Sequence, residues 1–347
     1  MSQFWSERVK TLKPYVPGEQ PKVEGLIKLN TNEHPYGPSP KVFEAIAQAN
    51  DGRLRLYPDP ESQALRQTVA EYFNLTPEHV FLGNGSDEVL AHTFFGLLKH
   101  DLPILMPDVT YSFYPVYCRI YGVEFQSIPL NEQYQIDLDD YNVPNGGGIF
   151  ANPNAPTGCE VGLEAIEAFL KQSKSSVVVV DEAYVDFGAQ SAASLIQQYP
   201  QLLVVQTLSK SRGLAGLRVG FALGQPDLIE ALTRVKDSFN SYPLDRLAQA
   251  AAVAAMQDDG YFRETCDKIQ QTREWLAEAL VAKGFSVLPS SANFIYASPS
   301  HISAAELQQQ LRDKNILVRH FDLPRLRDHL RITIGTREEC EALLAAI

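Results

Sequence analysis

The sequence predicts an α/β fold with a large, mostly parallel sheet and a smaller α+β unit in its C-terminal part. Helical and strand patterns alternate from about residue 41 to residue 225, as they do where helices connect parallel strands. The run Val177–Val180 is β-branched and apolar throughout, which is typical of a strand covered on both faces. After residue 225 helical patterns dominate, and the chain ends in short strands and helices, so a second unit is expected there.

The individual elements follow from the period of the apolar residues. In the first part, helices are predicted over residues 4–12, 41–49, 62–73, 87–98, 112–121 and 162–171, and strands over 26–29, 103–106, 123–128, 148–151, 177–181, 203–206 and 219–223. In the second part, helices are predicted over 226–236, 244–256 and 259–283, followed by strand, strand, helix, strand and helix over 285–288, 293–296, 303–312, 330–334 and 337–347. We therefore expect a large domain over residues 30–240 and a small domain formed by residues 1–29 and 241–347.

Charge and composition exclude several classes of function. The 347 residues carry 42 acidic and 30 basic side chains, so binding to nucleic acid is not expected. No apolar run has the length of a membrane span, and no secretory signal is visible at the N-terminus. The four cysteines are widely spaced without a CxxC pair, which argues against a metal site and a disulfide framework. These features predict a cytoplasmic protein that binds small molecules and neither metal nor membrane.

Lys210 is the first candidate for chemistry. It follows the apolar run Leu202–Val205, and it stands in a turn of hydroxyl and glycine residues with Arg212 and Arg218 close behind. Poor hydration and neighbouring cations make an amine a better nucleophile toward carbonyl groups. Such a lysine could form a Schiff base, although a lysine after a strand is, by itself, more often a surface residue.

Four other segments also stand at predicted strand ends, where ligands gather in open α/β sheets. Asp181 could meet a cationic ligand or cap a helix. The loop Gly83–Glu88 could hold a phosphate on backbone N–H groups, or be a plain strand–helix turn. Asn152–Gly158 offers oriented amides or a rigid turn, and Pro107–Tyr111 offers an aromatic face or a core tyrosine.

Taken together and in this order, the segments resemble the fold type I pyridoxal-phosphate enzymes, and among them the histidinol-phosphate aminotransferases. The resemblance rests on the ordered motifs G-x-G-S-D-E, P-x-x-x-Y, N-P-N-x-P-T-G, D-E-A-Y and S-K-x-x-x-L-A-G-L-R-x-G, and it covers essentially the whole chain. The segments L-x-P-Y-x-P-G near the N-terminus and R-I-T-I-G-T near the C-terminus are typical of that subfamily.

The resemblance implies pyridoxal 5'-phosphate as the cofactor and a role for each matching residue. Lys210 would form the Schiff base and shuttle the substrate proton, and Asp181 would face the pyridine nitrogen. Tyr184 and Asn154 would reach the phenolic oxygen of the ring, and Tyr111 would stack on it. The phosphate would lie at the backbone of Gly85, Ser86 and Asp87, completed by Thr207, Ser209 and Arg218.

The resemblance also implies the substrates and the assembly. Histidinol phosphate would be the amino donor and 2-oxoglutarate the acceptor, yielding glutamate, with their anionic ends met by Tyr15, Asn32, Arg319 and Arg331. Family members are homodimers, and Tyr57 matches a tyrosine that reaches the partner's cofactor phosphate. An aromatic amino-acid aminotransferase, a threonine-phosphate decarboxylase and a non-catalytic binder of the cofactor remain alternatives.

The chain departs from the family pattern at two positions. Ala155 stands where the motif often has a second asparagine, which leaves open whether Asn154 or a water serves the ring oxygen. His34 replaces a frequent asparagine, and we expect it to be a solvated loop residue.

Overall fold

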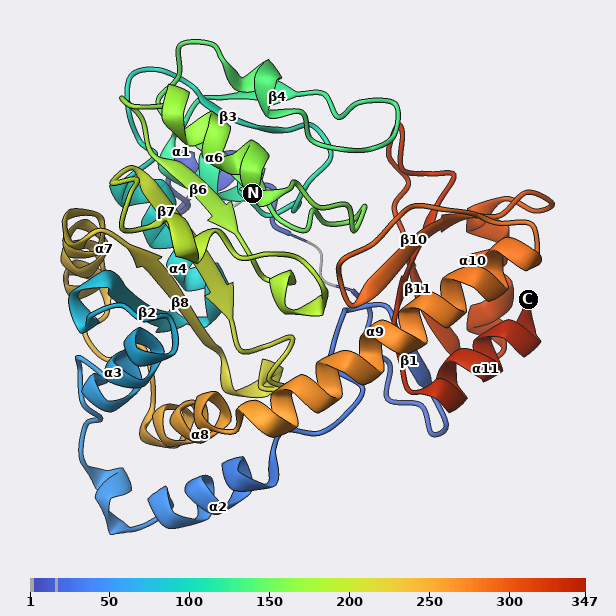
Figure 1. Ribbon diagram of the computed structural model, residues 1–347, viewed down its shortest axis with the longest axis horizontal. Helices are drawn as coiled ribbons and strands as arrows, with labels where there is room; N and C mark the ends of the chain where they lie inside the picture. The colour runs from blue at the N-terminus through green and yellow to red at the C-terminus, as the bar shows by residue number, and fades with distance from the viewer. Residues whose placement is uncertain (1–2, 16–17) are drawn as a thin grey trace.

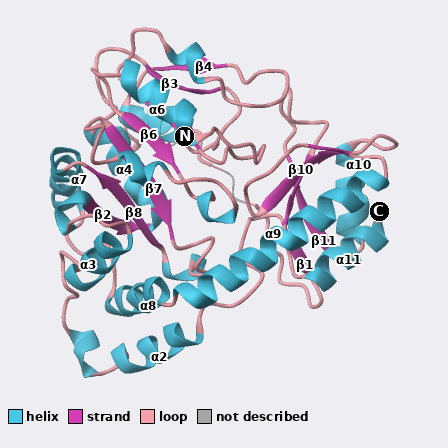
Figure 2. Cartoon of the chain, viewed as in Figure 1, coloured by secondary structure: helices cyan, strands magenta, loops and turns pink. Residues whose placement is uncertain are grey.

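The computed structural model describes residues 3–15 and 18–347 and contains two β-sheets (Figure 1). Figure 2 shows the two sheets as separate groups of strands with helices around each. The large sheet has the order β2-β8-β7-β6-β5-β3-β4, in which β8 is antiparallel to both neighbours and all other pairs are parallel. Its strands are β2 (Val80–Asn84), β3 (Ile104–Pro107), β4 (Phe125–Ile128), β5 (Gly148–Ala151), β6 (Val178–Asp181), β7 (Leu202–Thr207) and β8 (Val219–Gly224).

Helices cover both faces of the large sheet, as the apolar run at β6 predicts. Val178 and Val180 belong to one apolar cluster and Val179 to another on the opposite face, because successive side chains of a strand alternate. The first cluster is covered by α2 (Pro40–Ala49), α3 (Gln63–Tyr72), α6 (Leu163–Gln172) and α8 (Arg246–Gln257). The second is covered by α4 (Gly85–Gly96), α5 (Tyr114–Tyr121) and α7 (Pro226–Phe239). The predicted mostly parallel α/β fold is confirmed.

The small sheet has the order β1-β11-β12-β10-β9 and joins the two ends of the chain. Its strands are β1 (Ile27–Leu29), β9 (Ser286–Val287), β10 (Phe294–Ser298), β11 (Ile316–His320) and β12 (Leu330–Thr333). Strand β1 pairs in parallel with β11, so the N-terminal segment belongs to this sheet, as expected. Helices α9 (Asp259–Ala282), α10 (Ala304–Asp313) and α11 (Arg337–Ala346) pack on it, and α9 runs from beside α8 to the small sheet (Figure 1).

The structure differs from the predicted elements in one unpredicted strand and in the bounds of a helix and a strand. Strand β11 was not predicted, because only its first three residues are buried and its last two, Arg319 and His320, are polar. The predicted helix over residues 4–12 shrinks to α1 (Glu7–Thr11), which Ser6 caps at its N-terminus. The strand predicted over 123–128 begins only at Phe125. The domain boundaries at residues 29–30 and 240–241 stay a prediction.

Among the described residues, no helix has both the length and the apolar character that crossing a membrane requires. The cytoplasmic location stays a prediction. All four cysteines lie buried as free thiols.

Candidate active site

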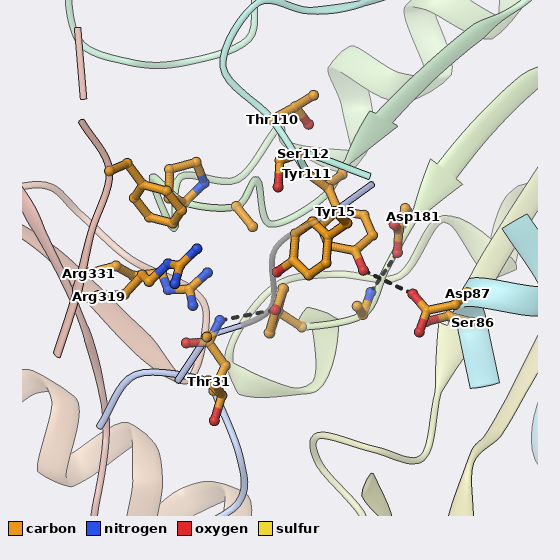
Figure 3. A pocket seen from close by; sticks show the side chains of 18 of the residues that line it. Tyr15, Thr31, Ser86, Asp87, Thr110, Tyr111, Ser112, Asp181, Arg319 and Arg331 are labelled. Carbon is orange, nitrogen blue, oxygen red and sulfur yellow. Dashed lines mark hydrogen bonds between the residues drawn. The ribbon is translucent and has the colours of Figure 1, made fainter. Parts of the chain in front are cut away.

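A cavity of about 640 Å³ opens between the large sheet and the small sheet. Its wall carries nearly all of the predicted site residues: Tyr15, Asn32, Ser86, Asp87, Tyr111, Asp181, Tyr184, Thr207, Ser209, Lys210, Arg218, Arg319 and Arg331. Figure 3 shows Asp87 and Asp181 at one side of this cavity and Arg319 and Arg331 at the other. The carboxyl ends of the parallel strands supply the first side, and β11 and β12 of the small sheet supply the second.

Lys210 lies on the cavity wall in the turn that follows β7. Its Nζ donates a hydrogen bond of 3.3 Å to the backbone oxygen of Thr31, and it lies 5.7 Å from the ring centroid of Tyr184. In the same turn, Thr207 donates to Ser209 Oγ over 3.0 Å and accepts from the Ser209 N–H over 3.1 Å. The two hydroxyls therefore order the turn that presents the amine.

Asp181 ends β6 at the bottom of the cavity and is 4% exposed. One carboxylate oxygen accepts a 2.8 Å hydrogen bond from the Tyr114 hydroxyl, and the other accepts from the Ala183 N–H over 3.3 Å. Burial raises the pKa of the Asp181 carboxyl to about 6, despite these two hydrogen bonds. A cation placed above Asp181 would hold the carboxylate in its charged form. No α-helix begins at Asp181, so the helix-cap alternative is excluded.

Asp87 connects the helix N-terminus of α4 to two other site residues. It accepts hydrogen bonds from Tyr111 over 2.9 Å and from Arg218 over 2.8 Å. Burial and the neighbouring Asp87 raise the pKa of Tyr111, so its hydroxyl stays protonated and donates. The three side chains form one network beside the exposed N–H groups that begin α4.

Two glycines allow this network to pack closely. A Cβ on Gly85 would lie 2.5 Å from the Arg218 guanidinium, and a Cβ on Gly220 would lie 2.3 Å from the Ser86 nitrogen. Gly85 also has a φ of 76°, which disfavours other residues. Arg218 itself adopts a left-handed backbone with a φ of 55° after the short 3-10 turn Ala215–Leu217. That turn carries the guanidinium back to the helix N-terminus.

Arg319 of β11 and Arg331 of β12 are neighbours on adjacent strands of the small sheet. They are directly opposed in the antiparallel pairing of β11 with β12, where like charges are unfavourable. Arg331 donates to the backbone oxygen of Asn30 over 2.9 Å, while its buried Nε has no hydrogen-bond partner in the described part of the chain. Burial lowers the pKa of the Arg331 guanidinium. Two adjacent guanidinium groups of this kind form a site for an anion.

Asn32 links the two sides of the cavity. Its amide donates a 3.0 Å hydrogen bond to the Tyr184 hydroxyl, and its Oδ1 accepts from Thr333 of β12 over 3.0 Å. Asn32 is 1% exposed and has a φ of 55°, a conformation that asparagine tolerates better than most residues. Tyr15 also lies on the cavity wall and packs on Phe113 with a centroid separation of 5.0 Å.

Three predicted residues do not line this cavity. Gly85 lies behind Arg218, and Tyr57 is 79% exposed on the surface of the large-sheet unit. Asn154 is buried, and its amide donates to the backbone oxygen of Val109 over 2.9 Å, while Ala155 stands on the cavity wall. The geometry does not favour a contact between the Asn154 amide and a cofactor ring, so that role stays a prediction.

His34 does not fit the expectation of a solvated loop histidine. The ring is half-buried, and its Nδ1 accepts a 3.1 Å hydrogen bond from the Tyr36 N–H. Burial lowers the pKa of His34, so the neutral ring is favoured. His34 lies outside the main cavity.

Sequence reasoning missed Tyr114, the hydrogen-bond donor to Asp181. The residue is fully buried as the first residue of α5 and stands three positions after Tyr111. Tyr111 lies in the turn before α5, where its carbonyl accepts from the Tyr114 N–H over 3.1 Å, and the centroids of the two rings lie 5.6 Å apart. The i, i+3 pattern of the two tyrosines was therefore the available signal.

The residues present fit pyridoxal 5'-phosphate. The N-terminus of α4 with Arg218 can bind a phosphate, and the buried Asp181 can pair with a protonated ring nitrogen. Lys210 lies between this end and the arginine pair, where its amine can meet the aldehyde. When bound, the cofactor supplies this aldehyde and a ring that withdraws electrons from the substrate Cα.

Comparison with known proteins agrees with this geometry. The profile of the family "Aminotransferase class I and II" matches residues 24–347. A histidinol-phosphate aminotransferase of Pseudomonas putida is 60% identical over 347 residues, covering 100% of both chains. Histidinol-phosphate aminotransferase 1 of Pseudomonas aeruginosa is 60% identical over 348 residues, covering 100% of this chain and 99% of that protein.

Solved structures show the same fold. The histidinol-phosphate aminotransferase of Sinorhizobium meliloti in complex with pyridoxal-5'-phosphate is similar with a TM-score of 0.89 and 25% identity, covering 100% of this chain and 97% of that one. The aspartate aminotransferase of Thermus thermophilus with maleate is similar with a TM-score of 0.83 and 19% identity over 99% of both chains, a likeness of fold alone.

Proposed function

This chain belongs to the class I and II aminotransferases, and from that membership we propose that it transfers the amino group of L-histidinol phosphate to 2-oxoglutarate. The products are imidazole-acetol phosphate and glutamate, and the reaction belongs to histidine biosynthesis. Pyridoxal 5'-phosphate is the cofactor of this family and of this enzyme.

The opposed arginines carry the proposal for the substrates. Histidinol phosphate has a phosphate and no α-carboxylate, whereas glutamate and 2-oxoglutarate have two carboxylates. Arg319 and Arg331 offer both kinds of anion a forked, permanently charged partner at the same end of the cavity. Tyr15 and Asn32 also line the cavity, and we propose them as further polar groups of this anion site, although the Asn32 amide also donates to the Tyr184 hydroxyl.

The chain's own groups then divide the chemical work. With the cofactor bound, Lys210 Nζ would act as the base that takes the proton from the substrate Cα and as the acid that gives it back. The Asp181 carboxylate would pair with the ring nitrogen and keep it protonated, and Tyr114 holds the carboxylate in place. Asn32 orients the Tyr184 hydroxyl toward the cavity. The residues that would hold the cofactor phosphate are Ser86, Asp87, Thr207, Ser209 and Arg218, and Tyr111 would meet its ring; all of them line the cavity.

The proposed active form is a homodimer in which Tyr57 completes the cofactor site of the partner. The tyrosine is 79% exposed and stacks on Tyr242 with centroids 4.6 Å apart, so its hydroxyl end is presented outward. Sedimentation of the holoenzyme is expected to give a dimer, and an active monomer contradicts this part of the proposal.

A half-reaction screen tests the substrate. Holoenzyme is mixed in turn with histidinol phosphate, phenylalanine, tyrosine and threonine phosphate, and loss of the visible absorbance of the bound pyridoxal form is followed. Histidinol phosphate is expected to react fastest. Faster reaction with an aromatic amino acid, or release of carbon dioxide from threonine phosphate, assigns the enzyme to the corresponding alternative activity.

A further inference from the structure

The exposed Tyr57 stands on a loop whose backbone is held from three directions. Arg246 donates to the Tyr57 carbonyl over 3.4 Å, and Gln249 donates to the Asp59 carbonyl over 3.1 Å. Lys236 donates to the Pro60 carbonyl over 3.2 Å. Because the backbone is already ordered, this large exposed aromatic side chain has little conformational entropy left to lose on binding. That favours contact with another surface.

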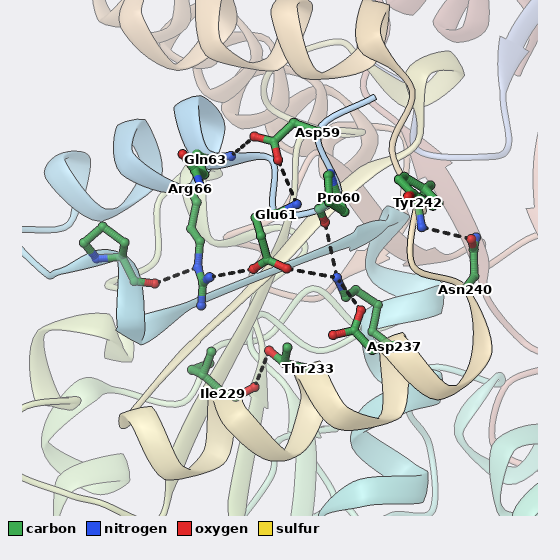
Figure 4. Close-up of polar contacts among 12 residues, drawn as sticks. Asp59, Pro60, Glu61, Gln63, Arg66, Ile229, Thr233, Asp237, Asn240 and Tyr242 are labelled. Atoms are coloured by element: carbon green, nitrogen blue, oxygen red, sulfur yellow. Dashed lines mark hydrogen bonds and ion pairs between the residues drawn. The ribbon is translucent and has the colours of Figure 1, made fainter. Parts of the chain in front are cut away.

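Lys236 is the unusual member of this group because it is only 5% exposed. It lies in the last turn of α7, and its ammonium reaches the Asp237 carboxylate over 2.9 Å and Glu61 over 3.9 Å (Figure 4). A buried ammonium is costly unless it is paired and hydrogen-bonded. Two carboxylates and the Pro60 carbonyl surround the Lys236 ammonium. The ammonium therefore holds the loop that carries Tyr57 against α7.

The same loop is also anchored on its far side. Asp59 accepts from the backbone N–H groups of Glu61 and Gln63 over 3.0 Å and 2.8 Å, which orders the entry to α3. Glu61 pairs with Arg66 over 3.3 Å (Figure 4). Arg66 also donates to the carbonyl of Val80 at the start of β2 over 2.9 Å. The loop is thus fixed to the strand that leads into α4.

We infer that Lys236 is a positioning residue that sets Tyr57 for the cofactor site of a second copy of this chain. The inference rests on the proposed function, which supplies the dimer and the role of Tyr57, and it adds the residue that holds this tyrosine. Lys236 does not line the cavity of its own chain, and it contacts the loop that carries Tyr57. Its effect is therefore expected in the partner's site.

The first experiment uses Lys236→Met in the full-length holoenzyme, because methionine keeps the length of the side chain and removes the ammonium. The dissociation constant of pyridoxal phosphate is expected to rise about tenfold, the size of one lost hydrogen bond to a charged group. Tyr57→Phe is expected to give a similar rise, and the double variant is expected to be no worse than either alone. Lys171→Met, which removes an exposed lysine paired with Glu167, is the matched control and leaves the constant unchanged.

Mixed dimers separate a role across the interface from a general loss of structure. One dimer joins a Lys236→Met protomer to a Lys210→Ala protomer, so the one site with Lys210 receives Tyr57 from an intact loop. The other joins a wild-type protomer to one that carries both substitutions, so the one site with Lys210 receives Tyr57 from the altered loop. The first is expected to bind the cofactor as wild type does, and the second about tenfold more weakly.

Equal affinities in the two mixed dimers overturn the inference. If Tyr57→Phe weakens cofactor binding and Lys236→Met does not, the inference is wrong while the proposed function stands. If the wild-type holoenzyme sediments as an active monomer, the dimer of the proposed function is wrong. Should Lys236→Met fail to fold, Gln249→Ala removes the neighbouring carbonyl contact and carries the same mixed-dimer test with a smaller expected change.

Discussion

The two walls of the cavity differ in the signs of their charged side chains and in the hydrogen bonds that hold them. On the large-sheet wall, Asp87 pairs with Arg218 and Tyr111, and Asp181 accepts from Tyr114. On the small-sheet wall, Arg319 and Arg331 face each other, and the Nε of Arg331 lacks a partner within the described residues. The first wall suits a group that stays bound, and the second suits anions that exchange during turnover.

The strongest test of this division removes the amine between the walls. Lys210→Ala is expected to lower kcat by about 10⁴-fold, because the group that moves the Cα proton is lost. It is also expected to abolish the visible band of the covalently bound cofactor, measured by absorbance. An intact band contradicts the assignment, and Lys171→Ala serves as the control for an unrelated lysine.

Asp181→Asn probes the large-sheet wall by removing one charge and keeping the shape. We expect kcat to fall by about 10³-fold, because a neutral amide no longer keeps the ring nitrogen protonated. Exchange of the substrate α-proton, followed by nuclear magnetic resonance, measures the affected step. Cofactor binding is expected to persist, and near-normal exchange contradicts the role of Asp181.

The pH dependence of the free energy of unfolding tests the buried Asp181 carboxyl in the cofactor-free protein. The pKa of Asp181 is raised to about 6 by burial, so between about pH 4 and pH 6 the folded state binds a proton that the unfolded state has released. The free energy of unfolding is therefore expected to fall as the pH rises through this window, by about 3 kcal/mol for this group. Asp181→Asn is expected to remove that share, as measured by urea unfolding at several pH values. If the variant keeps the pH dependence of the wild-type protein, the raised pKa of Asp181 is contradicted.

Arg331→Gln probes the small-sheet wall and is expected to have the smallest effect on turnover. The KM for histidinol phosphate and for 2-oxoglutarate is expected to rise about 30-fold, because both lose a charged hydrogen-bond donor. Stability is expected to change by less than about 1 kcal/mol, since the substitution also relieves the repulsion from Arg319. Steady-state kinetics with each substrate measures the first effect, with Arg312→Gln as the control. A rise in one KM alone separates the binding of phosphate from that of carboxylate.

Much of the large-sheet wall could be predicted because its residues stand at the ends of their own strands. Asp181 follows β6, Lys210 follows β7 and Ser86 follows β2, and parallel strands bring their carboxyl ends to one edge. Tyr114 escaped prediction because a buried tyrosine in a helix is usually a core residue. The role of Asn154 stays a prediction, and only the folded loop shows that its amide also donates to the Val109 carbonyl.

The small-sheet wall could not be derived in the same way. Arg331 is 301 positions from Asn30, whose carbonyl it binds, and its position opposite Arg319 depends on a strand that the sequence pattern did not reveal. Likewise, the carbonyl of Pro60 meets Lys236 across 176 positions. Contacts of this range depend on how the packed elements meet and leave no local periodicity in the sequence.

The sequence by itself determined the α/β fold, the order of the motifs and the residue types at the strand ends, because these depend on local periodicity and turn chemistry. The tertiary structure decided which charges are paired. It satisfied Asp87 and Asp181, set Arg319 against Arg331, and buried Lys236 beneath the loop of Tyr57. The physical reason is that burial and distance set the energy of a charge, and both arise only when distant segments pack together.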